Sequence, residues 1–253
     1  MDLLFDLGNT RMKIACRDAA GVRSLATLAW DASDFLARWH DLDITPPERI
    51  AIANVTRSHR LDALQALLAV RFADVPPRIA QTEAQCGRLH IAYAQPQKLG
   101  VDRFLALLAA SQQPQLQLLV GLGTAMTIDA LAANGQHLGG LIVPGVRLMR
   151  KAMTRAAPNV DWHDGAHCID FASDTASALE SGIWCALAGA VERSAQRLAM
   201  SAAAAPLVLL HGGDAPMLAA QLALPVRRDA LLVMRGLAAY LDAGVAQSRP
   251  MSD

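Results

Sequence analysis

Residues 6–10 (DLGNT) combine side-chain types that can hold a phosphate group. A glycine at the end of a strand lets the backbone approach a phosphate closely, and Asn, Thr and free N–H groups donate hydrogen bonds to its oxygens. Asp6 can hold Mg²⁺ against phosphate oxygens, through water, and Lys13 can add a compensating positive charge. An ordinary hairpin turn is the alternative, and neither a Walker A sequence nor a dinucleotide fingerprint is present.

A second glycine-rich turn lies about 115 residues further along, in residues 121–129 (GLGTAMTID). Its glycines free the backbone, and the Thr124 and Thr127 hydroxyls can donate hydrogen bonds; an ordinary hairpin is again the alternative. Two such turns from two domains could grip one triphosphate from both sides. Residues 211–216 (HGGDAP) would supply a third turn, suited to adenine or ribose.

Asp102 and Arg103 stand side by side in LGVDRF (99–104), at a predicted helix start. Phosphoryl transfer to a hydroxyl needs a carboxylate that orients the hydroxyl and accepts its proton, and a cation suits an anionic substrate. Asp102 is therefore the candidate base. The structural alternative is an acidic residue favoured by the helix dipole, with Arg103 in a salt bridge.

Residues 161–167 (DWHDGAH) are a candidate metal site, because two acidic residues and two histidines stand close together in the sequence. Their spacing does not support a zinc site, and a solvated irregular loop is the favoured interpretation. We assign no metal to this segment.

Apolar patterning places these motifs on alternating strands and helices. Strands are predicted at 2–6, 11–17 and 50–55, and helices at 31–40 and 58–72, a mixture that indicates an α/β layer structure. A helix at 99–111 is broken by QQPQ, so we expect domains at 1–112 and 113–253. The second half then repeats the strand, Gly/Thr turn and strand of the first, and continues with strand 206–210 and helices beginning at Pro144, Thr175 and Arg228.

Composition limits the class of partner. Lys plus Arg number 23 and Asp plus Glu number 23, so no net charge draws the chain to nucleic acid or to an anionic membrane. The four cysteines are scattered, which suits buried thiols in a reducing cytoplasm. No apolar run approaches the roughly 18 residues of a membrane span, and no targeting segment is evident, so we expect a soluble cytoplasmic protein.

The motifs taken together resemble the type III pantothenate kinases, a family that also includes Bvg accessory factor-like proteins. The resemblance rests on DLGNTRMK, LGVDR, GTAMTID, GGLIVPG, DTASALESGI and HGGDA, in that order over nearly the whole chain. It implies an actin-like, ribonuclease H-like α/β fold of two duplicated domains with mixed sheets flanked by helices. It also implies transfer of phosphate from ATP to pantothenate, giving 4′-phosphopantothenate in the first step of coenzyme A biosynthesis.

The resemblance assigns roles to positions of this chain. Asp102 would be the proton acceptor, and Asp6 would hold Mg²⁺ through water. The positions that would bind ATP are Asp6, Leu7, Gly8, Asn9, Thr10, Arg11, Met12, Lys13 and Thr124. Those that would contact pantothenate are Tyr93, Gly100, Val101, Asp102, Arg103 and Thr175. A second subunit completes the pocket in this family, so a homodimer is expected.

One position departs from the family pattern. The family commonly has DxGTA, whose Asp binds a monovalent cation such as K⁺ or NH₄⁺, whereas this chain has Gly121. The resemblance therefore predicts an altered or absent cation site. Asp129 is retained and would serve Mg²⁺, nucleotide positioning or structure.

Two alternatives remain open from the sequence. The first is an actin-like kinase or phosphatase with another acceptor, which should lack the combination of LGVDR and GGLIVPG. The second is a non-catalytic regulator, which would tolerate loss of Asp6 or Asp102, although both are present. The neutral charge and the lack of a basic helix argue against direct DNA binding.

Overall fold

The computed structural model describes residues 1–56, 58–160 and 165–247. These residues form two compact units, one made of Met1–Gln112 with the segment that begins at Leu231, and the other of Gln113–Ala230. The first unit holds β1 (Asp2–Leu7), β2 (Arg11–Asp18), β3 (Gly21–Ala29), α1 (Phe35–His40), β4 (Arg49–Asn54), α2 (Ser58–Arg71), β5 (Pro77–Ile79), β6 (Gln85–Cys86), β7 (Leu89–His90), a 3₁₀ turn (Pro96–Lys98), α3 (Val101–Ala110) and α7 (Leu232–Gln247). The second holds β8 (Gln117–Leu122), β9 (Ala125–Leu131), β10 (His137–Pro144), α4 (Val146–Ala156), α5 (Thr175–Ala202), β11 (Leu207–His211), α6 (Ala215–Ala219) and β12 (Val226–Arg228).

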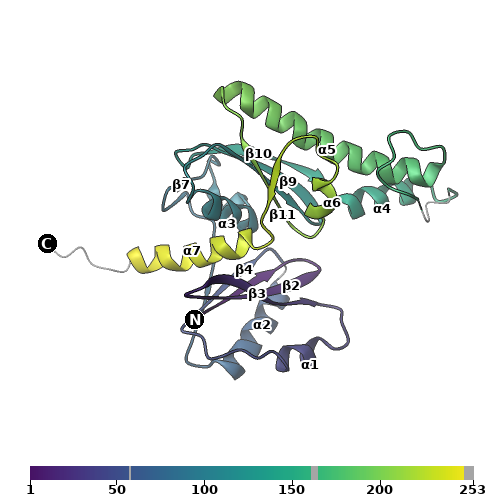
Figure 1. Ribbon diagram of the computed structural model, residues 1–253. Helices are drawn as coiled ribbons and strands as arrows, with labels where there is room; N and C mark the ends of the chain where they lie inside the picture. The colour runs from purple at the N-terminus through teal and green to yellow at the C-terminus, as the bar shows by residue number, and fades with distance from the viewer. Residues whose placement is uncertain (57, 161–164, 248–253) are drawn as a thin grey trace. The chain divides into compact units, whose positions relative to one another are not determined.

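The two units share one sheet topology. The strand order is β3-β2-β1-β4-β5 in the first and β10-β9-β8-β11-β12 in the second. In each sheet the first three strands in sequence are antiparallel, and the remaining two are parallel to the central strand (Figure 1). The repeat expected from the two glycine turns therefore extends over whole sheets.

Strand alternation divides the side chains of each central strand between two faces. Leu3, Phe5 and Leu7 of β1 belong to a buried cluster with residues of α2, so Asp2 and Asp6 lie on the opposite face. In β8, Leu118, Val120 and Leu122 pack against α5 in the same way, which leaves Gly121 on the face away from that core.

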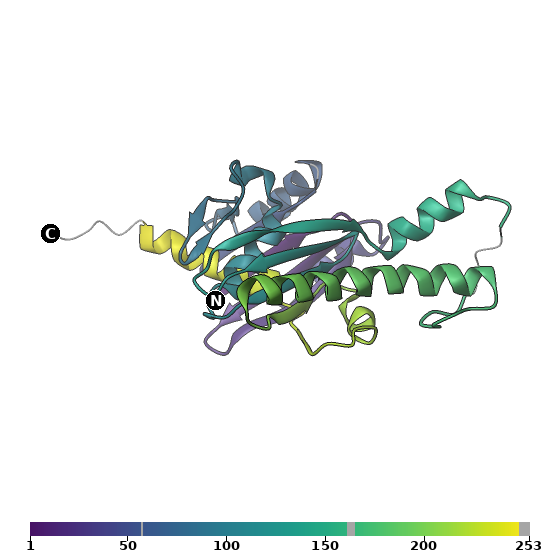
Figure 2. The same ribbon diagram turned by 90° about the horizontal axis from the view of Figure 1, so that it is seen from above.

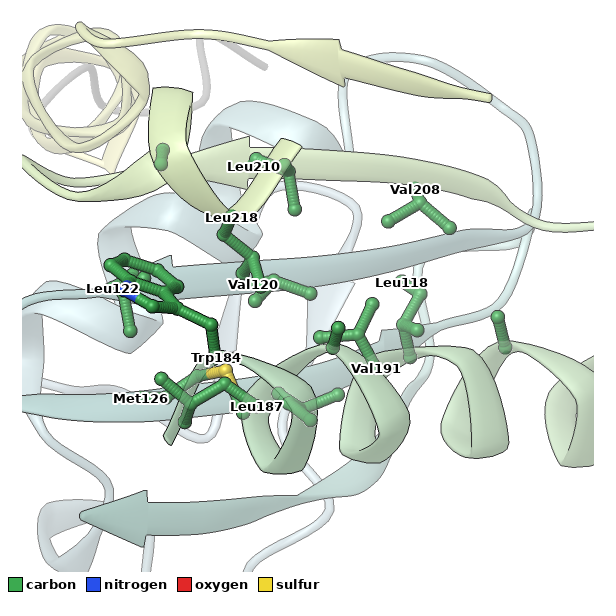
Figure 3. Packing of buried hydrophobic residues seen from close by; sticks show 14 of the residues in the cluster. Leu118, Val120, Leu122, Met126, Trp184, Leu187, Val191, Val208, Leu210 and Leu218 are labelled. Atoms are coloured by element: carbon green, nitrogen blue, oxygen red, sulfur yellow. The ribbon is translucent and has the colours of Figure 1, made fainter. Parts of the chain in front are cut away.

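Helix α5 covers one face of the second sheet. Its Trp184, Leu187 and Val191 point toward β8, β9 and β11 in Figure 3, where Met126 and Leu210 also contribute. Figure 2 shows that its N-terminal turns run past the strands beside α4. A bidentate ion pair, with Arg150 Nη2 2.6 Å from Glu180 Oε2, joins those two helices, and it lowers the pKa of Glu180.

Helix α7 packs with the first unit. It lies against α3 and β1, and Gly236 approaches the Leu105 backbone so closely that an added Cβ would overlap it (Figure 1). The expected boundary at 112/113 coincides with the boundary between the units. The expected domain 113–253 differs from the structure in its last part, because α7 buries its apolar face on α3.

One further expectation needs correction. The helix expected from Asp31 begins only at Phe35, since residues 31–34 form turns in which Phe35 N–H donates to the Ala32 carbonyl. Strand β3 was not anticipated. Among the described residues, no helix has both the length and the apolar composition of a membrane span.

Candidate active site

Asp6 lies near the end of β1, on the face opposite the α2 core. Its side chain is almost buried, and Lys13 Nζ of the neighbouring strand is 3.4 Å from its Oδ2. Burial raises the pKa of Asp6; the Lys13 charge opposes the rise, and the negative charge of Asp102 adds to it. Asp6 and Asp102, both in the first unit, are thus close enough for the charge of Asp102 to affect the pKa of Asp6.

Two residues that the sequence analysis did not predict donate hydrogen bonds to carbonyl groups of the turn after β1. Trp30 Nε1–H donates to the Gly8 carbonyl at 2.8 Å, and Arg60 of α2 donates to the Asn9 carbonyl. The Arg60 guanidinium lies 5.2 Å from the centre of the Trp30 ring. The backbone of the turn is therefore fixed by a side chain of α2 and by Trp30, which directly follows β3.

The other residues predicted to bind ATP in this segment differ in whether their side chains are accessible. The Leu7 and Met12 side chains are fully buried in the core, so only their backbone groups can meet a ligand. Asn9 and Arg11 are exposed, and Thr10 is half-buried. The Gly8 N–H donates to the Arg11 carbonyl at 3.0 Å, which closes the turn.

Helix α3 begins with the predicted base. Gly100 caps it, and Asp102 lies in its first turn, where Asp102 Oδ1 accepts a hydrogen bond from Arg103 N–H at 2.8 Å. A Cβ on Gly100 would stand 2.8 Å from that same Oδ1, so the glycine leaves room for the carboxylate. Val101, the other predicted residue here, is buried.

Arg103 is buried and is positioned by Tyr93. Its Nη1 donates to the Tyr93 hydroxyl at 3.2 Å, and its guanidinium lies 5.9 Å from the centre of that ring. Two residues predicted to contact an anionic substrate are thus in direct contact, within the unit that also holds Asp6 and Asp102.

The second unit repeats the glycine turn with a different support. Gly123 N–H donates to the Ala125 carbonyl at 3.0 Å, and Gly145 N–H, at the start of α4, donates to the Thr124 carbonyl at 3.2 Å. A Cβ on Gly145 would be 2.5 Å from the Gly123 oxygen, so GGLIVPG ends in a glycine because α4 starts against this turn. Thr124 is exposed.

Two other predicted positions, Thr175 and Asp129, lie in the second unit. Thr175 is the first residue of α5, exposed and next to the N-cap Asp174, whose Oδ1 accepts from Ser177 N–H at 2.8 Å. That backbone hydrogen bond lowers the pKa of Asp174. Asp129 is buried with its Oδ1 3.0 Å from His137 Nε2, which gives it a structural contact.

The possible metal cluster of residues 161–167 cannot be placed, because residues 161–164 lie outside the described residues. Among the residues that are described, no group of three His, Cys, Asp or Glu side chains is arranged to hold a metal ion.

A family model described as "Type III pantothenate kinase" matches residues 2–197. This chain belongs to the type III pantothenate kinase family. A protein of that name from Stenotrophomonas maltophilia (strain R551-3) is 41% identical over 218 residues, which are 86% of this chain and 88% of the relative. One from Xanthomonas euvesicatoria pv. vesicatoria (strain 85-10) is 39% identical over 252 residues, 96% and 98% of the two chains.

Solved structures agree with this family at the level of the fold. A Campylobacter jejuni protein, described as a conserved member of the Baf family of transcriptional activators, has a TM-score of 0.61 at 20% identity, over 96% of this chain and 99% of that one. The ethanolamine utilization protein EutJ from Carboxydothermus hydrogenoformans has a TM-score of 0.50 at 12% identity, over 94% and 89%. The predicted actin-like α/β class, with two mixed sheets flanked by helices, is confirmed.

Proposed function

We propose that this chain transfers the γ-phosphate of ATP to the hydroxyl of pantothenate, giving ADP and 4′-phosphopantothenate, the first step of coenzyme A biosynthesis. Membership of the family supports the reaction. The observation that carries the chemistry is the arrangement around α3, where Asp102 is positioned by the helix backbone and is electrostatically coupled to Asp6. A kinase of this kind needs one carboxylate for the metal and one for the hydroxyl proton.

In this proposal Asp102 orients the attacking hydroxyl and accepts its proton as the oxygen bonds to phosphorus and the bond to the ADP oxygen breaks. Arg103 supplies the positive charge that an anionic acceptor needs, and Tyr93 keeps its guanidinium in place. Gly100, Val101 and Thr175 are the further positions that we propose contact pantothenate.

ATP is proposed to bind through residues 6–13 and Thr124. Gly8, Asn9 and Thr10 offer backbone and side-chain donors, and Leu7 and Met12 offer backbone groups alone, because their side chains are in the core. Asp6, through its carboxylate oxygens, would hold Mg²⁺, whose hard-cation chemistry suits that donor. When bound, the ion neutralises charge that develops on the phosphate oxygens.

We further propose that the protein works in the cytoplasm as a homodimer. The four cysteines are all free thiols, which fits a reducing compartment. Leu141 and Ile142 of the edge strand β10 are more than half exposed, as apolar residues at subunit contacts often are in a lone chain. Analytical ultracentrifugation should find twice the chain mass, and a monomer at assay concentration would contradict the dimer.

The reaction is tested by ADP release from ATP in magnesium buffer, with and without pantothenate, and with glucose or acetate as control acceptors. We expect ADP release only with pantothenate. Equal release with a control acceptor would assign another substrate, and no release with any of them would favour a non-catalytic protein of this fold.

A further inference from the structure

The repeated sheets place two equivalent rows of three residues side by side. In the first sheet Asp6 of β1 pairs with Lys13 of β2 on one side and Ala53 of β4 on the other. In the second sheet the same row is Thr127 of β9, Gly121 of β8 and His211 of β11. Residues paired across neighbouring strands point to the same face, so each row presents its side chains together.

The larger side chain lies on the central strand in the first row and on the neighbouring parallel strand in the second row. The first row has a carboxylate on its central strand beside the methyl group of Ala53, whereas the second has a bare Gly121 beside an imidazole. A Cβ built on Gly121 would stand 2.7 Å from His211 Cε1, 2.8 Å from His211 Nε2 and 2.9 Å from Thr127 Oγ1. The His211 ring therefore fills the space that a side chain at position 121 would take.

The backbone around the ring keeps it there. Gly212, with φ of +99°, follows His211 and lies so close to Leu122 that an added Cβ would overlap the Leu122 backbone. The turn after β11 is thus pressed onto the end of β8, and the ring of His211 stays over Gly121.

The residues of this row do not fit the monovalent cation that the family pattern implies at position 121. Potassium and ammonium are bound by oxygens, chiefly carboxylate and carbonyl groups. Gly121 has no carboxylate, the volume beside it is taken by His211, and the Asp129 carboxylate nearby on β9 is engaged with His137 at 3.0 Å.

We infer that His211 replaces the carboxylate and its cation at this turn, so that this enzyme needs no potassium or ammonium. The part of this inference that is tested by reaction rates rests on the proposed kinase function. The part that is tested by melting temperatures does not.

The test restores the first row's arrangement in the second sheet. The variant G121D/H211A copies the pairing of Asp6 with Ala53, and G121N/H211A is its uncharged control. Melting temperatures are measured without substrates in KCl, NH₄Cl and NaCl at one ionic strength, and pantothenate-dependent ADP release is measured in the same salts.

We expect the wild type to melt at one temperature and to turn over at one rate in all three salts. For G121D/H211A we expect potassium to raise the melting temperature by about 3 °C over sodium, as ligand linkage predicts, and to raise the rate. G121N/H211A should not respond to the salt.

A wild type that melts higher or turns over faster in potassium or ammonium would overturn the inference while leaving the kinase function supported. A folded G121D/H211A that ignores potassium would also contradict it, because the ring would not be what excludes the ion. If that variant does not fold, the wild-type salt comparison still decides. If the wild type releases no ADP in any salt, that result would count against the kinase function alone. The melting temperatures would still test whether the protein binds potassium or ammonium.

Discussion

At the scale of single residues, the first turn of α3 determines what the carboxylate of Asp102 can do. Its Oδ1 accepts the Arg103 N–H, and the absence of a side chain on Gly100 leaves that oxygen its place. A carboxylate fixed in this way loses little entropy when the hydroxyl arrives.

The substitution Asp102→Asn tests this role. The amide oxygen can still accept the Arg103 N–H, so the fold should persist, but an amide cannot take up the hydroxyl proton. We expect kcat to fall by about 10² to 10⁴. ADP-release assays measure kcat. Calorimetry with pantothenate should find an affinity near that of the wild type. An unchanged kcat would remove Asp102 as the base.

Roles for Asp102 and Arg103 could be predicted from the sequence, because residue type and position at a helix start suggest them. It could not find His211 as the occupant of the space beside Gly121, because that relation depends on register across two strands far apart in sequence. The local signal was limited to a missing carboxylate at position 121.

At the scale of elements, the turn between β1 and β2 is stabilised by α2 and by the residue that follows β3. The Trp30 indole donates to the Gly8 carbonyl, and Arg60 lies over the indole ring. A turn whose carbonyl oxygens are engaged on one side presents its N–H groups in a fixed arrangement, which suits an anion. In the proposed ATP site, support from neighbouring elements would therefore substitute for a longer Gly-rich loop.

Replacing Trp30 by Phe tests that support. It keeps an aromatic ring beside Arg60 and removes the N–H donor to Gly8. Loss of one hydrogen bond of about 1 kcal/mol should raise the KM for ATP about fivefold. The KM for pantothenate is the internal control, since its proposed contacts lie on other segments, and equal increases in both constants would contradict a role specific to the turn.

The sequence indicated the hairpin of β1 and β2 but not β3. Residues 21–29 are mostly exposed or half-buried, so apolar and polar positions do not alternate clearly along that strand. Trp30 follows it directly, and nothing in the local pattern indicates its contact with Gly8. Strands β1, β4 and β8 were predictable because each has a continuous run of apolar residues in its buried middle.

At the scale of the whole molecule, the first unit is discontinuous in sequence, because α7 returns to it after the second unit. Ion pairs support the apolar contact of α7 with α3. Arg17 of β2 binds both Asp242 oxygens, at 2.6 and 2.8 Å, and Arg49 of β4 lies 3.2 Å from the same carboxylate. Apolar periodicity predicted a helix here, but it cannot say which sheet receives the buried face.

Two glycines in helices distinguish packing from helix propensity. Gly236 of α7 abuts the Leu105 backbone, so Gly236→Ala should destabilise the protein by about 1 to 3 kcal/mol through overpacking. Gly189 of α5 is exposed with open space around it, so Gly189→Ala should stabilise by up to about 1 kcal/mol. Differential scanning calorimetry measures both, and a stabilising Gly236→Ala would contradict the close approach of α7 to α3.

The ion pair of Asp242 predicts a pH dependence of stability. Its hydrogen bonds from Arg17 lower the pKa of Asp242, so the stabilisation is present above the unfolded value of about 3.9 and is lost as pH falls below it. Because the side chain is more than half exposed, we expect Asp242→Asn to cost only about 1 kcal/mol at neutral pH. Urea unfolding at pH 7 and near pH 3 should show that cost shrinking in acid, and a cost that is the same at both values would contradict the assignment.

The discontinuity of the first unit also bears on how the chain is made. Domains tend to fold as units while the ribosome extends the chain. The second unit is complete once Ala230 has emerged, whereas the first, though begun earlier, lacks α7 until Leu232–Gln247 has emerged as well. Until then α3 exposes the apolar face on which α7 will pack, so the earliest segments synthesised are the last to be protected from aggregation.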